Sequence, residues 1–354
     1  MNIKSLILGS AAALVAGGAA QAADLPVAEP VDYVKVCDAY GAGYFFIPGT
    51  DTCLKISGKV EFGVSSHGFS SNVARSDRLV DFYTETTFTF DAKEETELGT
   101  LALHMEFDDE DNITKGTNTA FDKAYLQIGG LYAGVTDSLV DFNEGLYYDD
   151  FGIGHGDLNA IGYVASFGNG VSAAIALEDY DANNAFGTLA GAGMSMPSVA
   201  ALLKVKQGWG TVKLGASAYQ HRYANAAVDT DLGFLIGGEG TFNLTDALTF
   251  GIAGGYDKGY KANGATGDLY AKWAVSGGLS FAVADNLTFG VDAGLIDYID
   301  ENYKNWGVSA GFGYTPVANL EIGGKIGYQK TDYDNSNTAD WDDVAAKMYI
   351  KRSF

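Results

Sequence analysis

The 354-residue chain is short of positive charge, of cysteine and of long apolar segments. Its 22 Lys and Arg stand against 45 Asp and Glu, and the net charge of −23 argues against a protein that binds nucleic acid through its phosphates. Two cysteines, Cys37 and Cys53, are too few for a disulfide scaffold or a four-cysteine zinc site. Beyond Ala23, no stretch approaches the roughly 18 continuous apolar residues of a membrane helix.

Glycine and aromatic residues are abundant instead. The chain contains 47 Gly, 21 Tyr and 20 Phe, and 47% of its residues are hydrophobic, which excludes a disordered polypeptide. Glycine without the three-residue period of collagen, combined with many aromatic residues, indicates short strands joined by turns.

The N-terminus is typical of an export signal. Lys4 precedes an apolar run, and the tripeptide Ala20-Gln21-Ala22 forms a small-x-small cleavage site, so we predict a signal peptide over residues 1–22. In an oxidising compartment Cys37 and Cys53 are expected to form a structural disulfide within an N-terminal segment of residues 23–53. Closing a loop of this length contributes about 3 kcal/mol on the chain-entropy model.

Apolar residues alternate with polar residues or glycine through the rest of the chain. In residues 100–107, for example, the apolar residues of one parity are Leu101, Leu103, Met105 and Phe107. Short spacers such as Gly129-Gly130 take turns with long polar ones, among them residues 65–79, 108–120, 137–159 and 257–269. This pattern predicts an all-β fold of sixteen antiparallel strands in up-and-down order over residues 54–354.

The apolar face of such a sheet meets either lipid or, in a soluble β-sandwich, a protein core. Lipid is favoured because the polar face is rich in Gly, Ser, Thr and charged residues that suit a water-filled interior. Aromatic residues near strand ends, such as Trp273, Phe281 and Trp306, match the girdles of membrane barrels. Only a closed sheet crosses a bilayer without unpaired backbone groups, so we predict a transmembrane β-barrel, with the sandwich as the alternative.

The last strand ends on Phe354, the terminal aromatic residue that outer-membrane barrels present to their assembly machinery. Together with the leader and the segment VKVCDAYGAGYFFIPGTDTCLKISGKV, this residue makes the chain resemble the general porins of alphaproteobacteria. Arg352 departs from that pattern, at a position that is usually apolar.

The resemblance implies a homotrimer of barrels in the outer membrane of a Gram-negative bacterium, each passing ions and small hydrophilic solutes. It also implies that the third long loop, residues 137–159, folds into the lumen as a constriction. The partners expected are outer-membrane lipid, lipopolysaccharide bridged by divalent cations to acidic loops, and the barrel assembly machinery, with no nucleic acid, cofactor or resident metal. A purely solubilising role for the acidic loops is an equal alternative.

The predicted constriction loop is acidic and contains neither Lys nor Arg. Its acids are Asp137, Asp141, Glu144, Asp149, Asp150 and Asp157. Candidate wall cations on the polar parity are Lys55, Lys59, Lys123, Lys204, Lys206 and Lys213. We predict weak cation selectivity, because the low-dielectric wall focuses the field of the loop acids. The alternative is an ordinary solvated acidic surface loop.

Enzyme motifs are weak. Ser309 lies in a G-x-S-x-G pattern, but the alternation of a strand continues through it, whereas a nucleophile elbow needs a strand-to-helix turn. None of the four histidines, His67, His104, His155 and His221, has a partner at helical metal-site spacing. We therefore expect a passive channel and no enzyme. The rival functions are a substrate-selective channel, a barrel enzyme and a purely structural or adhesive barrel.

Overall fold

The computed structural model describes residues 35–66, 68, 78–112, 116–143, 151–180, 195–222, 230–263, 268–334 and 339–354. The predicted signal peptide and residues 23–34 lie outside these ranges. In the described part of the chain, no helix is long and apolar enough to cross a membrane.

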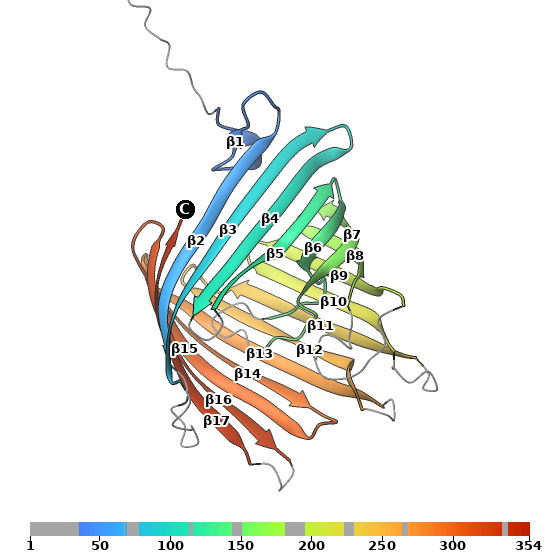
Figure 1. Ribbon diagram of the computed structural model, residues 1–354, viewed down its shortest axis with the longest axis vertical. Helices are drawn as coiled ribbons and strands as arrows, with labels where there is room; N and C mark the ends of the chain where they lie inside the picture. The colour runs from blue at the N-terminus through green and yellow to red at the C-terminus, as the bar shows by residue number, and fades with distance from the viewer. Residues whose placement is uncertain are drawn as a thin grey trace, which may run out of the picture.

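Sixteen antiparallel strands form one closed sheet, the wall of a barrel (Figure 1). They are β2 (Cys53–Ser66), β3 (Val80–Thr96), β4 (Gly99–Asn112), β5 (Gly116–Ile128), β6 (Leu131–Asp137), β7 (Asp157–Gly168), β8 (Val171–Glu178), β9 (Ser198–Gln207), β10 (Gly210–His221), β11 (Asp231–Asn243), β12 (Leu248–Asn263), β13 (Asp268–Ala284), β14 (Leu287–Tyr298), β15 (Tyr303–Val317), β16 (Leu320–Tyr333) and β17 (Trp341–Ser353). Each strand pairs with the next along the chain, and β17 returns to pair with β2, where Ile350 lies opposite Phe62. The prediction of a sixteen-stranded barrel is confirmed.

The connections alternate between two rims. At one rim, which we call the turn rim, residues 97–98, 129–130, 169–170, 208–209, 244–247, 285–286 and 318–319 make tight turns. Longer segments, such as residues 179–197 and 222–230, join the strands at the other, the loop rim. Short turns on one side and longer loops on the other are the arrangement of outer-membrane barrels, whose turns face the periplasm.

Two of the predicted long loops are wrong. Residues 108–120 and 257–269 belong mostly to strands, because β4 and β5 are separated only by residues 113–115, and β12 and β13 only by residues 264–267. These hairpins are built from polar residues such as Asp108 and Asp109. Backbone pairing does not depend on apolar side chains, so the polarity of these segments does not prevent them from forming strands.

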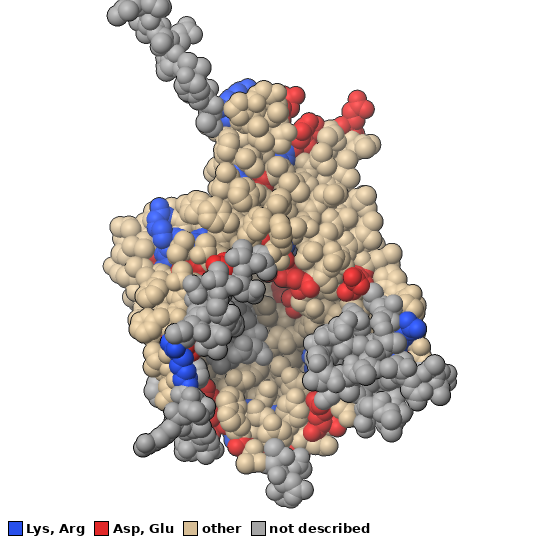
Figure 2. Space-filling view, in the orientation of Figure 1, with Lys and Arg blue, Asp and Glu red and all other residues tan. Residues whose placement is uncertain are grey.

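The outer face of the barrel is apolar. Large side chains are exposed all around the wall, for example Phe82 at 57%, Leu214 at 57% and Ile326 at 55%. Figure 2 shows a largely uncharged wall over β3 to β5, with acidic side chains toward the strand ends. A soluble monomer does not expose an apolar surface of this extent, so the outer face is the one that meets lipid.

Aromatic side chains stand on the outer face near the strand ends, as predicted. Phe281 and Tyr314 are exposed close to the turn rim. Toward the loop rim, the rings of Trp306 and Tyr328 lie 5.5 Å apart, and the indole nitrogen of Trp306 donates to Asp332 at 2.9 Å. These rings have an apolar body and a polar end, the character required at the boundary between lipid and water.

The end of the chain completes the seam between β17 and β2. Phe354 exchanges two backbone hydrogen bonds with Gly58, of 3.0 and 3.2 Å. Its ring meets Phe88 of β3 edge to face at 5.6 Å, and a Cβ at Gly58 would come within 3.1 Å of that ring. The terminal aromatic residue is therefore part of the wall.

A small lobe precedes the barrel at the turn rim. It contains the 3₁₀ turn η1 (Asp38–Tyr40) and the two-residue strand β1 (Phe45–Phe46), which pairs with β2 (Figure 1). The predicted disulfide between Cys37 and Cys53 is confirmed, and both cysteines are buried with Tyr44. The disulfide ties the lobe to the first residue of the barrel wall.

Candidate functional site: the lumen and its constriction loop

The two described arms of the loop between β6 and β7, residues 138–143 and 151–156, turn into the barrel and lie on the lumen wall. They are paired near the base by a backbone hydrogen bond from Ser138 to Gly156 of 3.0 Å. Further along, Phe142 and Ile153 exchange two backbone hydrogen bonds of 3.0 and 2.9 Å. The loop thus enters the lumen as a narrow hairpin with satisfied backbone groups.

Glycines of the wall provide the surface on which this loop packs. The ring of Phe142 lies over Gly215 and Gly237, and Ile153 lies against Gly255. A Cβ at Gly237 would come within 2.8 Å of the Phe142 ring, and one at Gly255 within 3.0 Å of Ile153. Side chains at these positions would occupy the space that the loop fills.

The second arm of the loop uses two more glycines. Phe151 lies against Gly294 of β14 and Gly307 of β15, where an added Cβ would come within 2.3 and 2.8 Å of its side chain. The loop side chains concerned, Phe142, Phe151 and Ile153, are at most 2% exposed. The described arms of the loop therefore contact the lumen face of β10, β11, β12, β14 and β15 at five glycines, Gly215, Gly237, Gly255, Gly294 and Gly307, which we call the glycine strip.

Two wall acids hold the first arm of the loop. Glu178, at the end of β8, accepts hydrogen bonds from the Ser138 hydroxyl at 2.9 Å and the Leu139 amide at 2.8 Å. Glu239 of β11 accepts one from the Asn143 amide at 3.2 Å and forms an ion pair of 2.6 Å with Lys213. Carboxylates accept such bonds strongly, so both acids fix the position of the loop.

Two of the predicted loop acids lie together at its base. Asp137 and Asp157 are directly opposite each other at the ends of β6 and β7. Lys123 of β5 forms an ion pair of 2.8 Å with Asp137. Two carboxylates therefore share one nearby cation.

Asp141 lies farther along the loop, half-buried against Gly154 of the opposite arm. Burial raises the pKa of its carboxyl group, and the negative charges of Asp137 and Glu239 raise it further. It lines a recess of about 430 Å³ between loop and wall, together with Lys204 and Lys213. The other three predicted acids, Glu144, Asp149 and Asp150, lie outside the described residues.

The predicted wall lysines stand at different heights. Lys204 and Lys213 are cross-strand neighbours beside the loop, whereas Lys206 lies one step nearer the turn rim. Lys59 forms an ion pair of 2.7 Å with Glu85 of β3. Lys55 lies against Tyr44 in the disulfide lobe, with its ammonium group 5.9 Å from the ring centre.

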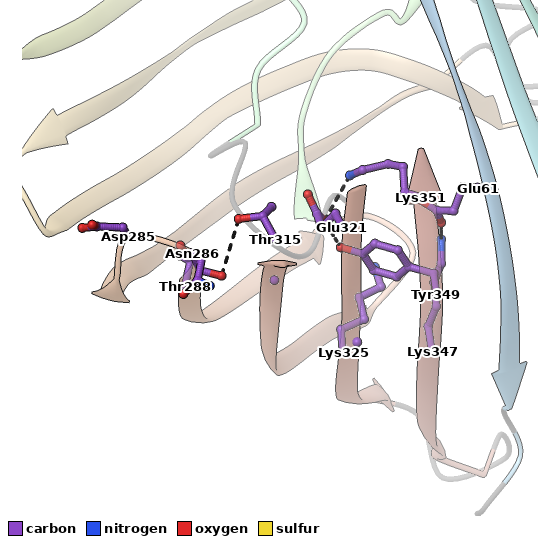
Figure 3. Close-up of a pocket in the computed structure, with 12 residues that line it drawn as sticks. Glu61, Asp285, Asn286, Thr288, Thr315, Glu321, Lys325, Lys347, Tyr349 and Lys351 are labelled. Carbon is purple, nitrogen blue, oxygen red and sulfur yellow. Dashed lines mark hydrogen bonds and ion pairs between the residues drawn. The ribbon is translucent and has the colours of Figure 1, made fainter. Parts of the chain in front are cut away.

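A second basic wall, not among the sequence candidates, occupies β16 and β17. It lines a recess of about 440 Å³ with lumen-facing Lys325, Lys347 and Lys351 (Figure 3). Lys347 pairs with Glu61 at 2.8 Å, and Lys351 with Glu321 at 3.1 Å. In the sequence, Lys347 and Lys351 alternate with Met348 and Ile350, which indicates the lumen face. This alternation does not show which wall cations share a recess.

The hydroxyl group of Tyr349 stands between these pairs and donates to Glu321 at 2.6 Å. Lys347 lies 4.5 Å from the centre of the Tyr83 ring and 5.5 Å from that of Tyr349. Contacts with ring faces and carboxylates hold the lysines against the wall, so that their charge faces the water of the lumen.

A closed barrel with an apolar outer face, a charged lumen and a loop lodged inside it has the parts of an aqueous channel. The family model described as "Porin subfamily" matches residues 24–352 of the chain. The chain belongs to this porin family.

Curated relatives of this porin include Porin Omp2a of Brucella ovis, which is 36% identical over 330 residues, covering 84% of this chain and 91% of that one. Porin Omp2b of Brucella neotomae is 36% identical over 323 residues, covering 84% of this chain and 86% of its own. The resemblance to alphaproteobacterial porins is confirmed.

Among solved structures, this porin is similar to the outer membrane channel DcaP of Acinetobacter baumannii, with 16% identity, a TM-score of 0.75, and coverage of 87% of this chain and 99% of that one. An anion-selective porin from Comamonas acidovorans has 12% identity, a TM-score of 0.62, and coverage of 86% and 100%. The trimer form of OmpT from Vibrio cholerae has 10% identity, a TM-score of 0.56, and coverage of 86% and 100%. At these identities the likeness concerns the fold.

Family and fold together identify an outer-membrane diffusion channel of a Gram-negative bacterium rather than an enzyme. The G-x-S-x-G pattern of this porin lies in the middle of β15, where Ser309 faces the lumen and donates to Asp292 at 2.8 Å. A serine on a straight strand lacks the exposed elbow position of a hydrolase nucleophile.

Carboxylates also gather on β4 and β5. Glu106, Asp108 and Asp122 bring one oxygen each within 4.8 Å of one another, close enough to share a cation. Such acidic groups are common in proteins without a metal, and here they add to the negative charge of the wall.

Proposed function

We propose that this porin is a weakly cation-selective general channel, whose size limit is set by the loop of residues 137–159. The observation that carries the proposal is the seating of that loop on the glycine strip, which brings Asp141 into the lumen beside Lys204 and Lys213. A loop inside the lumen narrows the path for solutes, and its charge acts where the path is narrowest.

The balance of charge supports a preference for cations. On the wall, lysines and acids offset each other in the pairs Lys59–Glu85, Lys213–Glu239, Lys347–Glu61 and Lys351–Glu321. The loop has no Lys or Arg, and at its base one lysine, Lys123, faces two acids. The uncompensated charge of the loop is therefore negative, and the low-dielectric wall strengthens its field.

Reversal potentials in planar bilayers under a KCl gradient test this selectivity. We expect a modest preference for potassium, and a preference for chloride would overturn the proposal. A general channel should pass neutral sugars at rates that fall smoothly with size, whereas saturable flux blocked by one solute would favour the substrate-selective alternative.

We also propose that the porin is a homotrimer. The solved trimer form of the Vibrio cholerae protein has the same fold, which supports the proposal. A concentration of large aromatic side chains on neighbouring strands offers a contact surface, which we call the phenylalanine face: Phe62, Phe82, Phe88, Phe107 and Phe121. Aromatic residues are enriched at the centres of protein interfaces.

Dissociation of the oligomer on heating tests the phenylalanine face. Phe62→Ala/Phe82→Ala should lower the temperature at which the trimer separates more than the control Phe289→Ala/Phe312→Ala, which removes a comparable outward pair from β14 and β15. Equal effects would place the contact elsewhere, and a wild type that is monomeric in mild detergent would reject the trimer.

Two further partners belong to the proposal. The packing of Phe354 into the β2–β17 seam supports recognition of this residue by the barrel assembly machinery, so its deletion should reduce insertion into the outer membrane.

Acids near the loop rim, including Asp108 and Asp109, support bridging to lipopolysaccharide through divalent cations. Chelation should then lower the thermal stability only when lipopolysaccharide is present.

A further inference from the structure

Three carboxylates gather on the lumen face of the wall where β4 pairs with β5. Glu106, Asp108 and Asp122 each place one oxygen within 4.8 Å of the other two. A calcium ion binds oxygen at about 2.3–2.6 Å, so two oxygens on opposite sides of the ion stand about 4.6–5.2 Å apart. The three oxygens therefore have the spacing of ligands that share one calcium ion.

A β-bulge brings the third carboxylate to this face. The register shifts by one residue between Glu106 and Phe107 of β4, which leaves Asp122 as an extra residue of β5. Lys123, the next residue, faces the lumen, where it pairs with Asp137. Strict alternation would turn Asp122 toward lipid, and the bulge turns it inward to the other two acids instead.

Two buried oxygens beside these acids lack a hydrogen bond. Thr87 of β3 lies directly opposite Asp108 and is 8% exposed. Within the described ranges, neither the Thr87 hydroxyl group nor the Oδ1 atom of Asp108 has a hydrogen-bond partner. Buried polar atoms left unsatisfied cost free energy, so each such pair requires an explanation. A hard cation, which takes oxygen ligands, would satisfy both atoms at once.

The lysines on neighbouring positions of the wall are held by other acids. Lys59, which lies opposite Thr87, forms an ion pair of 2.7 Å with Glu85. Lys123, which lies opposite Glu106, forms its ion pair of 2.8 Å at the base of the constriction loop. The positive charge of both lysines is therefore directed to acids outside the cluster. A divalent cation would offset the repulsion among the three carboxylates.

We propose that Glu106, Asp108 and Asp122, together with the hydroxyl group of Thr87, form a calcium site on the lumen wall. Acids alone would not make a site, and the unsatisfied buried oxygens are the second observation that supports it. Calcium takes about six to eight oxygens, so water of the lumen completes the coordination. The site binds calcium without lipopolysaccharide, unlike the bridging proposed above.

Isothermal titration calorimetry of the intact porin tests the site. The protein is purified in detergent free of lipopolysaccharide, treated with EDTA, dialysed and titrated with CaCl₂. We expect one calcium ion per chain with a Kd of about 10⁻⁴ to 10⁻³ M, the range of extracellular calcium modules. MgCl₂ should bind more weakly, because magnesium requires shorter bonds in a strict octahedron. Calcium binding that does not saturate, or equal binding of magnesium, would overturn the proposal.

Variants locate the bound ion. Asp108→Asn/Asp122→Asn keeps the size of both side chains and removes their charge, so calcium binding should weaken by at least about tenfold. Thr87→Val should weaken it to a smaller extent. The matched control is Asp342→Asn/Asp343→Asn, which removes two carboxylates from the start of β17, outside the cluster, and should bind calcium as the wild type does. Equal weakening in the two double variants would show a general effect of charge and reject the site.

If the double variant fails to fold, the single variants Asp122→Asn and Thr87→Val decide. Unchanged calcium affinity in both of them would overturn the assignment of ligands. Binding is measured without any current through the pore. A porin that prefers chloride, or whose loop does not set the size limit, would therefore leave the calcium site standing.

Discussion

The aromatic ring of Phe151 lies directly on the backbone of Gly294, where an added Cβ would come within 2.3 Å of the phenylalanine side chain. One residue belongs to the constriction loop and the other to the barrel wall. The contact joins the loop that enters the lumen to the wall whose other face meets lipid.

Gly294→Val should displace the second arm of the loop toward the centre of the lumen. Phe151 is the group nearest to the added atoms, so we expect a lower single-channel conductance and a loss of about 1–3 kcal/mol from overpacking. Gly313→Val is the control, because an added Cβ there meets nothing closer than Glu321 at 3.7 Å. Equal conductance in the two variants would contradict the glycine strip.

Asp141→Asn should make the cation selectivity less dependent on pH. Because the pKa of Asp141 is raised by burial and by Asp137 and Glu239, this carboxyl group still holds its proton at pH values where an ordinary aspartate is charged. Wild-type selectivity should therefore rise as pH increases through that raised pKa. Reversal potentials measured across this range should show a smaller rise in the variant.

The raised pKa of Asp141 also makes the stability of the folded porin depend on pH. Between the ordinary and the raised pKa of Asp141 the folded state binds more protons than the unfolded state, so stability falls as pH increases through this window. Asp141→Asn should remove that part of the decline. Thermal denaturation at several pH values measures it, and a steeper decline in the variant would contradict the assignment.

Lys347→Gln should increase the preference for cations. It removes one positive charge from the β16–β17 wall and leaves Glu61, which is 7% exposed, with the Tyr83 hydroxyl group at 2.8 Å. The reversal potential under a KCl gradient should move toward that of potassium. The control is Lys330→Gln at the loop rim, where Lys330 pairs with Asp340 at 3.3 Å. An equal shift of the reversal potential in the control would contradict a specific effect of the lysines on the lumen wall of β16 and β17.

Cys37→Ser/Cys53→Ser should weaken the lobe without changing conductance. The disulfide joins the lobe to the start of β2, whereas the hydrogen bonds that close the barrel run between β17 and β2. We expect a loss of about 3 kcal/mol on the chain-entropy model. Denaturation temperatures and single-channel currents measure the two effects separately, and an altered conductance would indicate that the lobe reaches into the path of solutes.

Alternation in the sequence was sufficient to predict the barrel, because a strand with water on one side and lipid on the other has a two-residue period. The same reasoning failed for residues 108–120 and 257–269, since these polar segments lack a clear alternation although their backbones pair as strands.

The site was less predictable than the wall. Alternation places Lys55 and Lys347 on the same face of the sheet, but the distance of each residue from the rim depends on strand register. In the structure Lys55 lies against Tyr44 of the lobe, whereas Lys347 lines a recess of the lumen. The glycines at 255 and 294 could be expected to leave space in the lumen, and the structure adds which side chains fill that space. That contact depends on how far the loop reaches across the barrel.

The seam between the first and last strands also bears on how this polypeptide reaches its native state. Gly58 and Phe354 lie far apart in the sequence, near the two ends of the barrel segment, yet their mutual hydrogen bonds complete the closed sheet. Until these two strands pair, the sheet has two edge strands whose backbone N–H and C=O groups find no hydrogen-bond partner in hydrocarbon. Closure of this seam is therefore the step that pairs the last two free strand edges of the barrel.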